Sequence, residues 1–364
     1  MNQSLYDKLQ ILEPLEKEFE DLERLKAMER PLLSWYREHA RILPWREKPE
    51  PYRVWISEIM LQQTRVEAVK PYFARFMQEL PDIRSLASVS EDKLLKLWEG
   101  LGYYSRAKNL KKAAELLVKE YGGELPASYE ELKKLPGIGS YTAGAIASIA
   151  FGIPVPAVDG NVLRVISRVT GSMEDILKQS VKSAMEKKLK EVMPQDAASS
   201  YNQGLIEIGA IVCVPNGNPL CSQCPLFSIC VARARNLTGI IPVKTPKKPR
   251  KSEDKTVLLL WREGRVAIRK REDSGLLASL YEFPNLEGHL SEEDVLSVLG
   301  AKDAKITALP VSRHIFSHVE WHMTGYRIDL TDGLEEDYLW VTPEDIKKTY
   351  SLPGAFKAYT KLIR

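Results

Sequence analysis

Four cysteines crowded into one short stretch constrain this chain more than any other feature of its sequence. Cys213, Cys221, Cys224 and Cys230 follow the spacing C-x7-C-x2-C-x5-C, and the 364 residues hold no other cysteine. Thiols this close together in a cytosolic chain are typical of a metal site rather than of disulfides. One C-x2-C pair with wider gaps favours a [4Fe-4S] cluster. Zinc, which usually takes two separated C-x2-C pairs, stays the alternative.

The length and the net charge of the chain limit the folds and functions that it can have. A chain of 364 residues is long enough for two or three domains. It holds no apolar run of about 18 residues, so we expect no membrane span. Its first 30 residues lack the apolar core of a signal peptide. The net charge of +3 is too small by itself to indicate nucleic-acid binding, which would need a local basic face.

The pattern of apolar residues divides the chain. Helical periodicity over residues 31–236 predicts an all-α domain, preceded by a charged helical extension over 1–30. Residues 237–255 are rich in proline and lysine, a composition that keeps a linker extended. Short strand-like runs separated by turns then predict an α+β domain over 256–364.

Two glycines, Gly137 and Gly139, lie between a predicted helix over 128–135 and another over 141–150. Glycine adopts the left-handed backbone that other residues resist, so a helix cap is one interpretation. The other is a hairpin whose N–H groups, next to a helix start, bind a phosphate. The spacing alone leaves both open.

Several motifs occur in a fixed order along the chain. They are LPWR (43–46), SEIMLQQT (57–64), WEGLGYYSRA (98–107), LPGIGSYTAGA (135–145), VDGNV (158–162), the cysteine cluster and FSH (316–318). Together they resemble the MutY family of adenine DNA glycosylases, within the helix-hairpin-helix superfamily that includes endonuclease III. The resemblance runs from about Leu33 to the C-terminus. It departs at the first cysteine gap, which is seven residues here and typically six in the family.

This resemblance implies a fold and a function. The fold is an all-α helix-hairpin-helix glycosylase domain with a [4Fe-4S] cluster, followed by an α+β domain of the Nudix (MutT-like) type. The function is base-excision repair: hydrolysis of the N-glycosidic bond of adenine opposite 8-oxoguanine or guanine in double-stranded DNA, leaving an abasic site. The resemblance also implies a monomer without a membrane partner, located in the bacterial cytoplasm at the nucleoid.

Two carboxylates fit the chemistry of this reaction. Glu58 lies in the apolar run VWISEIML, where burial should raise its pKa and keep it protonated as an acid. The resemblance implies that it protonates N7 of adenine, and that Asp159 faces the sugar cation, with Tyr141 and Asn161 orienting the two. Related bifunctional enzymes carry a lysine at the Tyr141 position, and a phenol cannot form an imine. Without the resemblance, Glu58 fits a helix surface and Asp159 fits a helix N-cap.

Reaching a paired adenine requires the base to be extruded and the gap to be filled. By resemblance, the segment after Glu58 on the same helix is the wedge, Tyr103 intercalates beside the lesion, and the glycine hairpin grips a phosphate. The wedge residues are Leu61, Gln62, Gln63 and Thr64, and the residues expected to line the adenine pocket are Trp45, Arg46 and Gln203.

The C-terminal domain lacks the REx2EE core of the Nudix catalytic box after residue 255, so we expect it to bind rather than hydrolyse. The resemblance implies that Phe316, Ser317 and His318 inspect 8-oxoguanine, and a serine hydroxyl can both donate and accept there. Two alternatives remain. One is a DNA-damage-binding protein without catalysis, and the other is a thymine or uracil glycosylase acting on mismatches.

Overall fold

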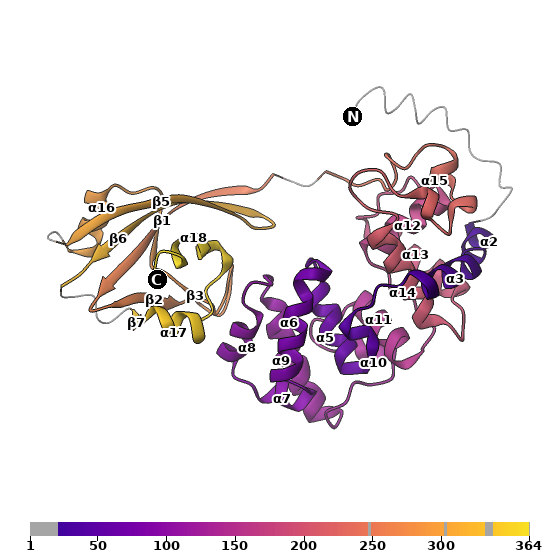
Figure 1. Ribbon diagram of the computed structural model, residues 1–364, viewed down its shortest axis with the longest axis horizontal. Helices are drawn as coiled ribbons and strands as arrows, with labels where there is room; N and C mark the ends of the chain where they lie inside the picture. The colour runs from indigo at the N-terminus through magenta and orange to yellow at the C-terminus, as the bar shows by residue number, and fades with distance from the viewer. Residues whose placement is uncertain (1–20, 247–248, 302–303, 332–337, 364) are drawn as a thin grey trace. The chain divides into compact units, whose positions relative to one another are not determined.

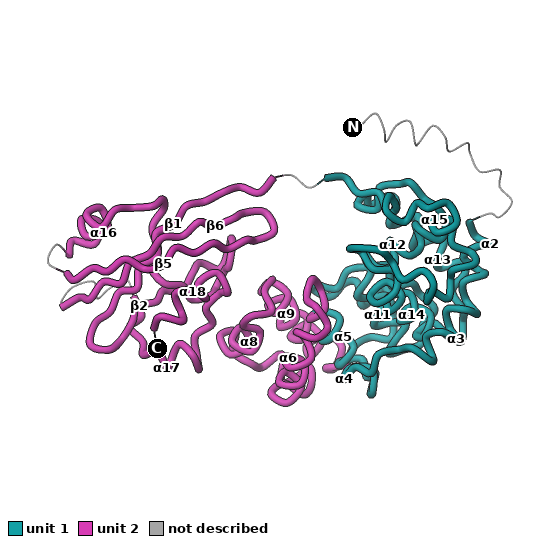
Figure 2. The backbone as a smooth tube through the Cα atoms, turned by 45° about the horizontal axis from the view of Figure 1, so that its top comes forward, with its two compact units in different colours: residues 1–59, 125–246 teal, residues 60–124, 247–364 magenta. Residues whose placement is uncertain are grey.

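The computed structural model describes residues 21–246, 249–301, 304–331 and 338–363. The chain forms two compact units, one of residues 1–59 with 125–246 and the other of residues 60–124 with 247–364 (Figure 2). The helical part of the sequence is therefore divided between both units. The first 20 residues of the predicted N-terminal extension lie outside the described residues.

Helices build the first unit (Figure 1). They are α2 (Asp21–Lys26), α3 (Glu29–His39), α4 (Pro44–Glu47), the start of α5 (Pro51–Leu61), α10 (Tyr129–Leu132), α11 (Ser140–Phe151), α12 (Gly160–Thr170), α13 (Gln179–Val192), α14 (Ala198–Ile211) and α15 (Val231–Ala234). Apolar residues at helical spacing on α12 and α14, including Val162, Ile166, Leu205 and Ile208, are buried in one core. Asp159 and Asn161 lie at the start of α12, Gln203 lies on α14, and Cys213 follows α14.

Helices α6 (Val66–Glu79), α7 (Ile83–Ser88), α8 (Glu91–Trp98) and α9 (Ser105–Glu120) belong to the second unit. Their core contains Phe76 and Trp98, whose rings meet edge to face with centroids 6.0 Å apart. A capping box between Asp82 and Ser85 begins α7, because each side chain bonds the backbone N–H of the other residue.

The second unit also contains a seven-stranded sheet (Figure 1). Its elements are β1 (Lys251–Arg262), β2 (Arg265–Lys270), β3 (Tyr281–Glu282), β4 (Asn285–Glu287), β5 (Lys305–Ile315), β6 (Val319–Asp329) and β7 (Leu339–Val341), with α16 (Glu292–Leu299), α17 (Pro343–Lys348) and α18 (Lys357–Thr360). The strand order is β3-β2-β1-β6-β5, with β4 and β7 paired to β1 and β2. The predicted α+β class is confirmed.

Alternation along β1 gives the sheet two buried faces. Val257 and Leu259 point into a core with α17 and α18, whereas Leu258 and Leu260 point into a core with α16. Strand β1 starts at Lys251, inside the predicted linker, and pairs in parallel with β6. Residues 251–255 are therefore strand rather than linker, because that pairing supplies backbone partners that composition does not reveal.

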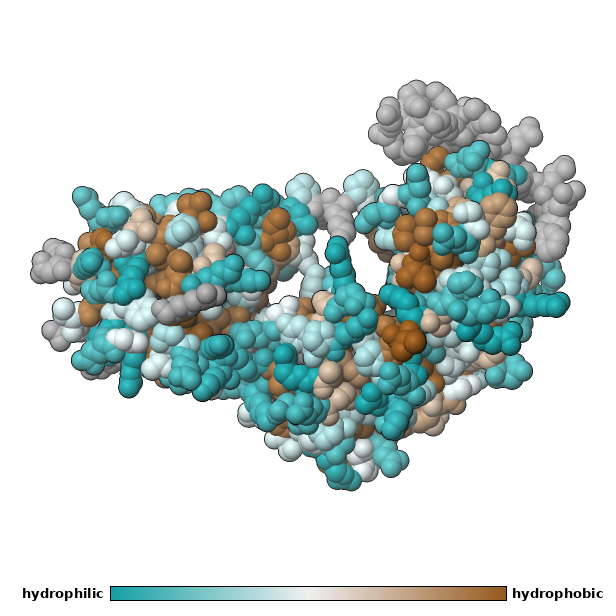
Figure 3. Space-filling model, in the orientation of Figure 1, coloured by the Kyte–Doolittle hydropathy of each residue, from teal (hydrophilic) through white to brown (hydrophobic). Residues whose placement is uncertain are grey.

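Among the described residues, no helix is long and apolar enough to cross a membrane. On the face shown in Figure 3, hydrophilic side chains predominate and hydrophobic ones form separate patches. The large apolar side chains of Trp55, Trp98 and Tyr201 are instead fully buried.

Candidate active site and cysteine cluster

A buried carboxyl and a phenol form the centre of the site. Glu58 on α5 and Tyr141 on α11 lie 83 positions apart in sequence, and the Tyr141 hydroxyl donates to Glu58 Oε2 at 2.7 Å. Glu58 is 7% exposed. Removal from water raises its pKa to about 7, and the bond from Tyr141 opposes that rise only in part. Near neutral pH, Glu58 can therefore both hold and release a proton.

Asp159 is the N-cap of α12. Its Oδ1 accepts the backbone N–H groups of Asn161 at 2.9 Å and Val162 at 2.8 Å, and its Oδ2 accepts Asn161 Nδ2 at 2.8 Å. Burial raises the pKa of Asp159, and these hydrogen bonds counteract it. The charge of Asp159 also contributes to the raised pKa of Glu58. The same carboxylate therefore caps α12 and lies close enough to Glu58 to affect its pKa.

A hydrogen-bonded path joins this carboxylate to the cysteine segment. Arg164 donates from Nη2 to Asn161 Oδ1 at 2.8 Å and from Nε to the Cys213 carbonyl at 2.7 Å. Arg168, one turn further along α12, donates to Cys213 Sγ at 3.2 Å. Both arginines are buried. Neither arginine was predicted as a site residue, although two arginines four residues apart in an otherwise apolar helix are a visible sequence signal.

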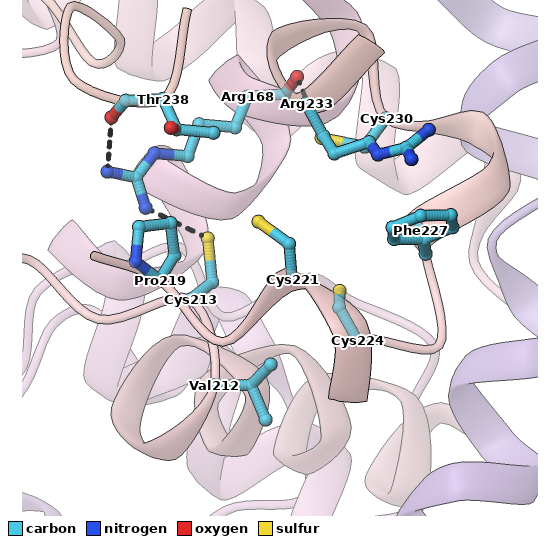
Figure 4. A pocket seen from close by; sticks show the side chains of 10 residues that line it. All are labelled: Arg168, Val212, Cys213, Pro219, Cys221, Cys224, Phe227, Cys230, Arg233 and Thr238. Atoms are coloured by element: carbon cyan, nitrogen blue, oxygen red, sulfur yellow. Dashed lines mark hydrogen bonds between the residues drawn. The ribbon is translucent and has the colours of Figure 1, made fainter. Parts of the chain in front are cut away.

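The four cysteines line one pocket (Figure 4). None of them forms a disulfide. Burial raises the pKa of the Cys224 thiol to about 12, so a bound metal would be needed to hold it as a thiolate at neutral pH. Arg168 borders the pocket together with Arg233, whose guanidinium lies 3.6 Å from the centre of the Phe227 ring. Across the described residues, no three potential ligands lie close enough to share a single metal ion.

Ion pairs to the buried carboxylate of Glu207 hold Arg46, one of the predicted adenine-pocket residues. Arg46 donates to Glu207 Oε2 at 2.8 Å, and Arg41 donates to Glu207 Oε1 at 2.7 Å. The pKa of Glu207 is lowered to about 2 because its bonds to the two arginines outweigh its burial. Trp45 is buried, and Gln203 donates to Ser199 Oγ at 3.1 Å. Glu207 was missed, although a lone acid in the apolar run GLIEIGAIV signalled it.

The predicted wedge departs from its expected helix. Leu61 is the last residue of α5, and Gln62, Gln63 and Thr64 form a turn. Gln63 has a φ of 58°, a left-handed conformation that cannot continue a helix, and it is exposed. The expectation that all four residues share the helix with Glu58 is therefore wrong for the last three.

The glycine pair joins α10 to α11. Gly137 has a φ of 78°, which favours glycine, whereas Gly139 is the N-cap of α11 with an ordinary φ of −88°. A Cβ at Gly139 would meet nothing within 4 Å. The backbone conformation therefore requires glycine at position 137 but not at position 139. The open space at Gly139 leaves the N-terminus of α11 accessible.

The predicted intercalator and the predicted lesion reader meet in the second unit. The Tyr103 hydroxyl lies 3.0 Å from Ser317 Oγ, and Tyr103 is 44% exposed with a φ of 47°. Ser317 and His318 are exposed in the turn between β5 and β6, and Phe316 packs on Trp321 with ring centroids 5.0 Å apart. Tyr104, by contrast, is buried.

Two families match parts of this chain. Residues 56–194 match the HhH-GPD superfamily of base excision DNA repair proteins, and residues 256–362 match the NUDIX domain. A solved thermostable thymine-DNA glycosylase has a TM-score of 0.53 at 27% identity, covering 58% of this chain and 97% of that one. An endonuclease III in complex with DNA has a TM-score of 0.50 at 25% identity, covering 58% and 98%. The chain is a base-excision DNA glycosylase by class.

Relatives that match most of the chain identify the family within this class. An adenine DNA glycosylase of Buchnera aphidicola subsp. Baizongia pistaciae is 37% identical over 297 residues, covering 81% of this chain and 83% of the relative. The adenine DNA glycosylase of Homo sapiens is 36% identical over 329 residues, covering 76% of this chain and 60% of the human protein. The chain belongs to the adenine DNA glycosylase family, and the predicted helix-hairpin-helix and Nudix-like fold is confirmed.

Proposed function

We propose that this chain hydrolyses the N-glycosidic bond of adenine paired with 8-oxoguanine or guanine in double-stranded DNA. The observation that carries the proposal is the buried Glu58, hydrogen-bonded to Tyr141 and close enough to Asp159 for that charge to raise its pKa. The reaction is monofunctional in this proposal, since Tyr141 offers no amine. We further propose that residues 31–236 and the region that begins with β1 at Lys251 are the two functional domains.

Protonated Glu58 would donate its proton to adenine N7, which makes the base a better leaving group. The sugar then gains positive charge, which the Asp159 carboxylate would stabilise electrostatically. Asn161 and the first N–H groups of α12 hold that carboxylate in place. After the proton has left, Glu58 can accept one from the attacking water.

Single-turnover excision from a panel of duplexes tests this function. We expect removal of adenine from A·8-oxoguanine and A·G duplexes, and no removal of thymine or uracil opposite guanine. Excision of thymine or uracil alone would favour the mismatch thymine or uracil glycosylase. Binding to all duplexes without excision would favour the non-catalytic alternative.

The pH dependence of excision follows from the Glu58–Tyr141 bond. Because the acid form of Glu58 is required, the excision rate should fall as pH rises through its pKa of about 7. The bond from Tyr141 lowers that pKa, so Tyr141→Phe should raise it and move the fall in rate to higher pH. Single-turnover rates across neutral pH measure the shift. A fall that stays in place or moves to lower pH contradicts the assignment.

We propose that the four cysteines hold a [4Fe-4S] cluster. Each thiolate of such a cluster binds a different iron atom, so the sulfurs lie farther apart than around one ion. Four free thiols that line one pocket, with only one C-x2-C pair and wider gaps around it, support that choice over zinc. The bound cluster would supply thiolate–metal bonds that tie the 213–230 segment together.

Metal analysis checks the cluster. Protein purified without air should be yellow-brown with about four irons per chain. Cys224→Ser should lower the iron content and the thermal stability together. A colourless protein with about one zinc per chain would instead assign the site to zinc.

We propose that Ser317, with Phe316 and His318 beside it, reads 8-oxoguanine. Its hydrogen-bonding distance to Tyr103 supports this role, because the intercalator and the reader would then reach adjacent bases. Ser317→Ala should reduce the preference for A·8-oxoguanine over A·G by about 5- to 150-fold, the worth of one good base contact. The ratio of single-turnover rates and affinities at one fixed salt concentration measures it. An unchanged ratio would make the turn only structural.

A further inference from the structure

One buried guanidinium connects two turns that are separate in sequence. Residues 60–64, here named the wedge turn, comprise the last two residues of α5 and the turn that follows them, and residues 101–103, here named the tyrosine turn, precede α9. Arg106 lies in the first part of α9 and is 8% exposed. Burial lowers its pKa to about 10, so it remains charged at neutral pH.

The Arg106 guanidinium bonds both turns at once. Nη1 donates to the carbonyls of Met60 at 2.9 Å and Gln62 at 2.7 Å in the wedge turn. Nη2 donates to the carbonyls of Leu101 at 3.0 Å and Gly102 at 2.9 Å in the tyrosine turn, and also to Thr64 Oγ1 at 3.4 Å in the wedge turn. A planar fork with fixed N–H directions is suited to this double task, whereas the compact ammonium of lysine is not.

Both turns hold a residue in an unfavourable conformation. Gln63 has a φ of 58° and Tyr103 a φ of 47°, and neither is glycine. Such conformations persist where the surroundings over-determine them, and they cluster at functional sites. The guanidinium also lies 5.6 Å from the centre of the Tyr103 ring, and the Tyr103 carbonyl accepts from Nε at 3.4 Å. Arg106 therefore bonds the backbone next to both strained residues.

We propose that Arg106 is a positioning residue that holds the wedge turn and the tyrosine turn as one preorganised pair for insertion into the base stack. This inference rests on the proposed function. A side chain that is already in place loses less entropy on binding, so locking both turns favours extrusion of the target base. Arg106 itself contacts no reacting atom in this proposal.

The test compares Arg106→Lys with the unaltered chain for their ability to unstack the target base. The probe is 2-aminopurine, placed beside the adenine of an A·8-oxoguanine duplex. Its fluorescence rises when neighbouring bases unstack. We expect the variant to need about tenfold more protein for half-maximal fluorescence, the effect of losing one base–aromatic stack. Binding to a fully paired duplex should change little, because phosphate contacts carry it.

Leu110→Ala is the matched control, since Leu110 is buried on the same helix and contributes to folding alone. The inference stands if two results are obtained together. Arg106→Lys must lower the thermal stability no more than Leu110→Ala does, and only Arg106→Lys must lose the fluorescence response. Equal responses in the two variants overturn it. The fluorescence change needs no bond cleavage, so failure of the inference is distinguishable from failure of the proposed adenine excision.

A second measurement does not require an Arg106 variant to fold. Gln63→Ala and Tyr103→Ala alter exposed positions, one in each turn. If Arg106 joins the turns into one unit, the two substitutions together should cost less probe affinity than the sum of their separate effects. Additive effects overturn the inference.

Discussion

Glu58→Gln should abolish adenine excision while leaving binding to mismatched duplexes nearly unchanged. Glutamine keeps the shape of the side chain and its oxygen can still accept the Tyr141 hydroxyl, but its amide has no acidic proton to transfer to adenine. General acid catalysis contributes about 10²–10⁴-fold, so the single-turnover rate should fall by at least that factor. Quantification of abasic sites after saturating single-turnover incubation measures the loss.

Glu186→Gln is the matched control for this substitution. Glu186 is a half-buried glutamate of the same unit that accepts Ser140 Oγ at 2.9 Å, and it has no proposed part in the chemistry. Its replacement should leave the excision rate within a few-fold of the unaltered chain. Near-normal excision by the Glu58 variant would remove Glu58 from the mechanism.

Asp159→Asn should have the second largest effect, a loss of about 10²–10³-fold in the excision rate at saturating DNA. That is the usual effect of removing one preorganised electrostatic contact to a developing charge. Asparagine is as good an N-cap as aspartate, so α12 should still form. One hydrogen bond, from Asn161 Nδ2, loses its acceptor, and the thermal stability should therefore fall only modestly.

Asp159→Ala separates the two roles of this side chain. Alanine removes both the cap and the charge, so unfolding should become easier by about 0.5–2 kcal/mol, the usual worth of an N-cap. Excision should be as low as in the asparagine variant. If asparagine instead retains most of the excision rate and alanine alone loses it, Asp159 acts only through the fold.

The sequence predicted the separate parts of this site well, because each part depends on near neighbours. The apolar run around Glu58 predicts burial, and burial is the main cause of its raised pKa. Asp159 before an apolar helix predicts an N-cap, which the structure contains. The cysteine spacing predicts one shared site, and all four thiols line one pocket. The roles assigned to these residues stay proposals.

The wedge residues show that the local sequence pattern is not sufficient to predict where a helix ends. The apolar periodicity of α5 continues into Leu61, and nothing nearby in the sequence signals that Gln63 turns left-handed. Carbonyls at that turn are bonded by Arg106, which lies more than 40 positions away. Strand β1 likewise begins inside a proline- and lysine-rich stretch, because β6 pairs with it.

By itself, the sequence determined the helical and α+β halves, the clustering of the four cysteines and the burial of Glu58. Only the tertiary structure decided which side chains meet: Tyr141 with Glu58, Glu207 with Arg41 and Arg46, and Ser317 with Tyr103. The reason is physical. Periodicity and capping act over a few residues, whereas a hydrogen bond or a pKa depends on every charged or polar atom that folding brings close, whatever its distance along the chain.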